Sequence, residues 1–63
     1  MTVFIPYTQW FTIQQWMTHN YITSSDYTWV RIEDRVAITF ASNMIYARFY
    51  RAWQHIILAD NDF

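Results

Sequence analysis

Residues 43–58, NMIYARFYRAWQHIIL, form the longest stretch of the chain in which apolar residues recur with a helical period. At about 100° per residue, one narrow stripe contains Ile45, Phe49, Ala52 and Ile56, with Trp53 at its shoulder. The pattern predicts a final helix that turns this stripe toward the core.

A second apolar arc lies beside that stripe and widens the apolar surface to about half of the helix, beyond the roughly 100° of an ordinary surface helix. Two interpretations stay open. Either the other helix covers the arc, as is usual for aromatic stripes, or the arc binds a partner protein. The predicted partner-binding residues are Tyr46, Tyr50, Trp53 and Ile57, with Arg51 and Gln54 at the polar rim.

The composition indicates one small domain, residues 1–63, with an unusually large share of aromatic side chains. Without cysteine the chain has no disulfide to stabilise so short a sequence, so large side chains or association must do so. Aromatic residues make up 22% of the chain, more than we expect so small a domain to enclose. We therefore expect a protein partner, either a second copy in a homodimer or a host protein.

The charge pattern disfavours several classes of function. A net charge of −1, with four arginines and no lysine, lacks the positive field of non-specific duplex binding. No apolar run is long enough for a membrane span or a secretory signal. We expect a soluble, cytoplasmic protein that uses no cofactor.

The first half of the chain predicts a strand and a helix. Residues 2–5 are β-branched and aromatic and are followed by Pro6, which is typical of an edge strand. A helix with Thr8 as its N-cap and Asn20 at its end follows. Its core face is predicted to contain Trp10, Ile13, Met17 and Tyr21, whereas Phe11 lies off this face.

The second half predicts a hairpin over residues 27–40 and then the final helix, with Ser42 as its N-cap. The polar residues 23–26, TSSD, form the turn before the hairpin. A three-residue loop, 33–35, would place Ile32 opposite Val36 and Val30 opposite Ile38, so that one face is apolar throughout. We therefore expect the longer loop rather than a two-residue one.

These elements predict an α+β fold of order β-α-β-β-α, with a three-stranded sheet and two helices packed on one face. The pattern does not determine whether the first strand neighbours the second or the third strand; of the two arrangements we favour the third strand in the middle. The open face would then contain Trp29, Arg31, Thr39 and Phe4. Three of these, Phe4, Trp29 and Arg31, could form a stacking platform for single-stranded nucleic acid, which is the alternative function.

Glycine is absent, so any residue with positive φ must be of another type. The residues that tolerate this conformation best are asparagine and aspartate. The predicted positions are Asn20, Asp34, Asn61 and Asn43.

The sequence offers little chemistry for an enzyme or a metal site. The serines occupy turn and cap positions, and neither His19 nor His55 has a second ligand at i+3 or i+4. Asp60 and Asp62 lack the glycine and glutamate of a calcium loop. The end of the chain, ADNDF, is either a solubilising terminus or similar to the acidic, phenylalanine-ended tips by which some single-stranded DNA-binding proteins recruit partners.

Residues 29–53, a short hairpin followed by a helix with Phe49 and Trp53 four apart, resemble small uncharacterised proteins of tailed bacteriophages. Ser42, Asn43 and Met44 stand where such proteins more often have acidic residues. The resemblance implies a viral accessory protein that binds and redirects a larger host or viral protein, and it implies no catalytic residue. We expect a non-enzymatic protein-binding module.

Overall fold

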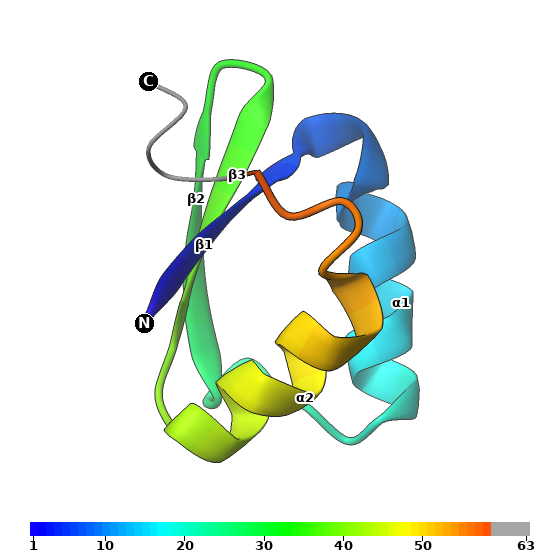
Figure 1. The fold of residues 1–63 in the computed structure, drawn as a ribbon, viewed down its shortest axis with the longest axis vertical. Helices are drawn as coiled ribbons and strands as arrows, with labels where there is room; N and C mark the ends of the chain where they lie inside the picture. The colour runs from blue at the N-terminus through cyan, green and yellow to red at the C-terminus, as the bar shows by residue number, and fades with distance from the viewer. Residues whose placement is uncertain (59–63) are drawn as a thin grey trace.

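The computed structural model describes residues 1–58 and shows an α+β fold. Residues 59–63, which include Asn61 and the predicted acidic tail, lie outside the described residues. The order of strands and helices is the predicted β-α-β-β-α (Figure 1). The elements are β1 (Thr2–Pro6), η1 (Tyr7–Gln9), α1 (Trp10–His19), β2 (Tyr27–Ile32), β3 (Arg35–Phe40) and α2 (Asn43–Trp53).

The three strands form one antiparallel sheet in the order β1-β3-β2, with β3 in the middle as predicted. Figure 1 shows α1 and α2 on the same side of this sheet. Between sheet and helices lies the core, where Phe49 of α2 and Ile13 of α1 are fully buried with Ile5, Val36 and Ile38. The Phe49 ring packs against Phe40 at 4.9 Å between centroids. The predicted core stripe is thus confirmed at its centre, and Ile45 packs beside it, partly buried. The helix ends at Trp53, short of the predicted residue 58, so Ile56 packs against the core from the segment that follows α2.

The register of the hairpin differs from the prediction. Its loop contains two residues, Glu33 and Asp34, so that Ile32 lies opposite Arg35 and Val30 opposite Ala37. Glu33 has a φ of 56°, the positive value that a type II′ turn requires at its first central residue. This turn brings the strands together one residue sooner than a three-residue loop would.

A register change of one residue moves each side chain of β2 to the opposite face. Trp29 now shares the helix-facing side with Ile38, and its ring lies 4.9 Å from that of Trp10 in α1. Val30 instead shares the open face with Ala37 and Phe4 and is 55% exposed. The predicted apolar inner face is confirmed for β3, where Val36, Ile38 and Phe40 are buried. It is wrong for β2, because the two-residue loop shifts the register by one and turns Tyr27, Trp29 and Arg31 to this face.

The two ends of α1 also differ in part from the prediction. Thr8 is not the N-cap, because the 3₁₀ turn η1 runs directly into α1 and Gln9 precedes the helix in a helical conformation. Asn20 ends the helix as predicted. Tyr21 is 90% exposed and outside the core, because the chain leaves the helical path before this residue. Phe11, predicted off the core face, is 68% exposed.

Candidate functional site

Helix α2 begins where the sequence predicts, at a capped N-terminus. Ser42 has extended dihedral angles, and its hydroxyl accepts a hydrogen bond from the backbone N–H of Ile45 at 3.2 Å. This cap sets the start of the helix, after which residues four apart lie above one another. Tyr46 and Tyr50 are such a pair, with ring centroids 5.9 Å apart.

The structure brings five of the six predicted partner-binding residues together. We call this set the tyrosine surface: Tyr46, Tyr50, Arg51, Gln54 and Ile57. Tyr46, Tyr50, Arg51 and Gln54 line one shallow hollow of about 460 Å³. Tyr46, Tyr50 and Gln54 also line a neighbouring hollow of about 210 Å³, which Ile57 and the start of β1 complete. The two tyrosines therefore form a shared ridge between two depressions.

The two tyrosines differ in burial and in their contacts with the core. Tyr46 is half-buried, and its ring meets Phe40 of β3 at 6.0 Å. Tyr50 is 43% exposed and lies one turn farther along the helix. Tyr46 thus anchors the ridge to the sheet, and Tyr50 offers its ring to solvent.

Trp53, the sixth predicted residue, lines neither hollow. Its ring packs edge-on against Trp16 of α1 at 5.9 Å, and His55 stacks on it at 6.0 Å. Its indole N–H is enclosed and has no hydrogen-bond partner within residues 1–58. The interpretation in which α1 covers the aromatic arc therefore holds for Trp53, whereas Tyr50 stays outside that cover.

A second groove runs beside the tyrosine surface, between α1 and α2. Trp16, Met44 and Ala52 contribute apolar lining, together with Ala47, Arg48 and Arg51, around about 580 Å³. Met44 is 75% exposed. The sequence reading did not select Met44 as a surface residue, although its spacing of four and seven from Arg48 and Arg51 places all three on one side of the helix.

The alternative nucleic-acid platform does not form on one face. The hairpin register places Trp29 and Arg31 on the helix-facing side, where the Arg31 guanidinium lies 3.7 Å from the centre of the Tyr7 ring. Phe4 pairs with Ala37 and lies on the opposite face. The predicted triad of Phe4, Trp29 and Arg31 is therefore divided, and the open face contains Thr39 without the tryptophan or the arginine.

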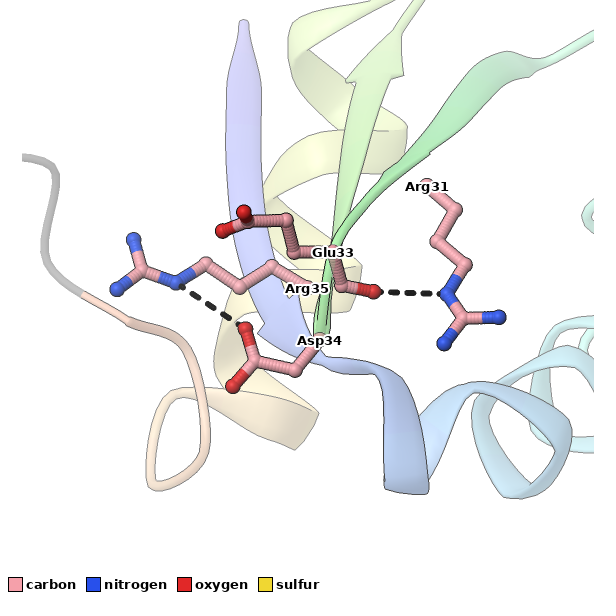
Figure 2. A network of polar contacts seen from close by, with 4 residues as sticks. All are labelled: Arg31, Glu33, Asp34 and Arg35. Carbon is pink, nitrogen blue, oxygen red and sulfur yellow. Dashed lines mark hydrogen bonds and ion pairs between the residues drawn. The ribbon is translucent and has the colours of Figure 1, made fainter.

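The hairpin tip carries much of the charge of the sheet. Arg31 donates from Nε to the backbone carbonyl of Glu33 at 2.8 Å, while the Glu33 carboxylate points away from it (Figure 2). Arg35 lies beside Asp34, with 4.0 Å between Nε and Oδ1. Arg31 thus contacts Glu33 through the main-chain carbonyl and not through its carboxylate.

The residues that could suggest catalysis are used in turns and caps. In the TSSD turn, the Asp26 carboxylate accepts a hydrogen bond from the Thr23 backbone N–H at 2.8 Å, and the Thr23 and Ser25 hydroxyls are 2.8 Å apart. Burial raises the pKa of Tyr27, whose ring lies edge-on to Trp10 at 6.4 Å. Residues 1–58 contain no cluster of three or more metal-ligating side chains.

Comparisons with protein-family models, curated proteins and solved structures find no match to this chain. Within residues 1–58, no helix is long and apolar enough to cross a membrane.

Proposed function

We propose that this protein is a non-enzymatic protein-binding module and that the tyrosine surface is where its partner binds. The observation that carries the proposal is the exposed ring of Tyr50. It stands beside Tyr46 at 5.9 Å, between two hollows, and is 43% exposed.

The arrangement has the properties of a binding hot spot. Tyrosine supplies a large, stiff contact area with few side-chain torsions to immobilise, and a hydroxyl that can hydrogen-bond at the edge of an interface. Arg51 and Gln54 are exposed beside the ring and provide the polar rim that surrounds such anchors. Tyr46, held against Phe40, keeps the ridge in place before a partner arrives, which lowers the entropic cost of binding.

The partner we propose is a host or viral protein in the cytoplasm of a host cell. The resemblance of residues 29–53 to small bacteriophage proteins supports this, because those proteins are expected to act by redirecting larger ones. A chain without cysteine is compatible with a reducing compartment.

The test begins with a probe that requires no knowledge of the partner. A random peptide library displayed on phage is selected against the protein, and the selected peptides are titrated while backbone amide NMR signals are followed. We expect the shifts to gather at Tyr46, Tyr50, Arg51 and Gln54. Shifts that gather elsewhere, or a selection that yields no binding peptide, would contradict the proposal.

The matched variants are two tyrosine-to-serine substitutions. Tyr50→Ser removes the exposed ring of the ridge and is expected to weaken peptide binding by about thirtyfold, the loss of a typical hot spot. Tyr21→Ser removes a ring that is 90% exposed and lies at the end of α1, so its peptide affinity should equal that of the unmodified protein. Equal affinities for both variants would reject the tyrosine surface as the site.

A further inference from the structure

The outer edge of β2 is a second surface at which another strand could bind. Since the sheet order is β1-β3-β2, β2 pairs with β3 on one side only, and no other strand of residues 1–58 pairs with its outer side. The strand is also exposed. Trp29, Val30 and Ile32 are 48%, 55% and 48% accessible.

The ladder identifies which backbone groups point outward from this edge. Ala41 donates its N–H to Asp26 O at 2.9 Å, so positions 26 and 41 form a hydrogen-bonded pair. Such pairs alternate along an antiparallel ladder, so Thr28 and Val30 also direct their N–H and C=O groups toward β3. The groups of Tyr27, Trp29 and Arg31 therefore point away from the sheet.

The two edges of the sheet are protected very differently. The β1 edge ends in Pro6, and the carbonyl of Phe4 on its outer side accepts a hydrogen bond from Leu58 N–H at 2.7 Å. Proline, charged side chains, bulges and covering segments are the usual means of blocking an edge strand. The β2 edge has no proline, and its one charged side chain, Arg31, is fixed against the Tyr7 ring and the Glu33 carbonyl. Within residues 1–58 no strand pairs with this edge.

We infer that β2 is the seam of a homodimer, in which the β2 strands of two copies pair antiparallel about a two-fold axis at Trp29 and form one six-stranded sheet. This register places Trp29 opposite Trp29 of the second copy. Tyr27 lies opposite Arg31 of the second copy, and the outward-pointing groups of each such pair exchange two hydrogen bonds.

A second copy fits this edge better than an unrelated strand for three reasons. Self-pairing about a two-fold axis is closed, since it uses both open edges and leaves only the two protected β1 edges outside. It places no like charges opposite each other, because Arg31, the only charged residue of β2, faces a tyrosine. Arg31 is also held in advance by Tyr7 and by the Glu33 carbonyl.

Amide hydrogen exchange of the unmodified protein tests the seam directly. Exchange is followed by NMR at low and high protein concentration. We expect the amides of Tyr27, Trp29 and Arg31 to exchange at least about tenfold more slowly at high concentration, because only dimerisation gives them partners. The amides of Thr28 and Val30 are bonded to β3 in both the monomer and the dimer, so their exchange should not slow in this way as the protein concentration rises. Exchange independent of concentration, or protection confined to α2, would overturn the inference.

Single-cysteine variants then test the register, because the chain has no native cysteine. In the inferred dimer the two positions 29 are about 5.5 Å apart between Cα atoms, within the range of a disulfide. The two positions 30 are offset along the strands and about 8 Å apart, which is too far. Trp29→Cys should therefore form disulfide-linked dimers on mild oxidation and Val30→Cys should not. The opposite result would reject the inferred seam.

The tyrosine surface and the seam can fail independently. Tyr50 lies on α2 beside the start of β1, at the opposite edge of the sheet from β2, so Tyr50→Ser should leave the concentration dependence of exchange at Trp29 unchanged. A variant that loses both peptide binding and dimerisation would show that the two surfaces are one, which contradicts the inference.

Discussion

Tyr21 occupies a position that glycine usually fills. It follows the end of α1 with a φ of 62°, and the chain closes the helix there by two backbone hydrogen bonds. Ile22 N–H donates to Met17 O at 2.8 Å, and Tyr21 N–H donates to Thr18 O at 3.2 Å. This is a Schellman motif, and Ile22 and Met17, both buried, supply the apolar contact that accompanies it.

We expect Tyr21→Gly to stabilise the protein. A left-handed conformation costs a residue with a β-carbon about 1–2 kcal/mol, and glycine escapes this cost. Part of the gain is lost because glycine is more flexible in the unfolded chain, so the net increase in the free energy of unfolding should be about 0.5–1 kcal/mol. Urea unfolding followed by tryptophan fluorescence measures it.

Tyr21→Ala is the control for this prediction. It removes the exposed ring but keeps the β-carbon, so its free energy of unfolding should stay within about 0.5 kcal/mol of the unmodified protein. If alanine and glycine stabilise equally, the backbone conformation is not the cause.

The predictions of positive φ at Asn20, Asp34 and Asn43 were wrong, although two of the regions were nearly right. The structure has positive φ at Tyr21 and Glu33, each one residue from a predicted position, and Asn61 lies outside the described residues. The prediction followed side-chain preference for the left-handed region. The actual positions follow from the geometry of the helix end and of the hairpin turn. This geometry fixes which residue must have a positive φ, whatever its side chain.

Helix α2 begins at a side-chain cap on which its first turn depends. Ser42 accepts from Ile45 N–H at 3.2 Å and satisfies one of the donors left free at the start of the helix. The helix carries both Phe49 of the core and Tyr50 of the tyrosine surface, so its stability matters for fold and for binding.

Ser42→Ala should lower the free energy of unfolding by about 1 kcal/mol, because the first turn loses its side-chain acceptor. Ser42→Asp keeps an acceptor and adds a negative charge at the positive end of the helix dipole, so it should retain most of the stability. Thermal unfolding followed by circular dichroism compares the variants. A loss as large for aspartate as for alanine would show that the cap does not stabilise the helix.

The register of the hairpin was predicted wrongly, and this error changed which side chains of β2 face the helices. The predicted register and the observed register of residues 27–40 both place alternate side chains on opposite faces of the sheet. They differ only by one residue in the length of the loop. The apolar pattern favoured pairing Val30 with Ile38. The observed pairing of Val30 with Ala37 moved Trp29 and Arg31 toward α1 and η1, and it divided the predicted nucleic-acid platform.

The stability of the whole molecule depends on aromatic side chains that join the sheet to both helices within the core. Phe49 is fully buried and meets Phe40 at 4.9 Å and Trp16 at 6.2 Å, so it joins the sheet, α1 and α2. A domain of 63 residues has roughly 3–9 kcal/mol of total stability. One central aromatic residue is therefore a large fraction of what holds the fold.

Phe49→Ala should abolish or nearly abolish folding at room temperature, since emptying such a site costs about 3–5 kcal/mol. Phe49→Leu leaves a smaller cavity and should remain folded with a reduced free energy of unfolding. Near-ultraviolet circular dichroism, which reports the packing of the aromatic residues, distinguishes the two. A cooperatively folded Phe49→Ala variant of unchanged stability would refute this account of the core.

The order of elements, the core stripe of α2 around Phe49, the Ser42 cap and the grouping of Tyr46 with Tyr50 could all be predicted from the amino-acid sequence. They depend on local hydrogen bonds and on helical periodicity, which neighbouring residues encode. The hairpin register, the cover of Trp53 by Trp16 and the unequal protection of the two sheet edges became known from the folded chain alone. Each of these features depends on which distant segment packs against it, and alternating patterns one residue apart satisfy the same local preferences.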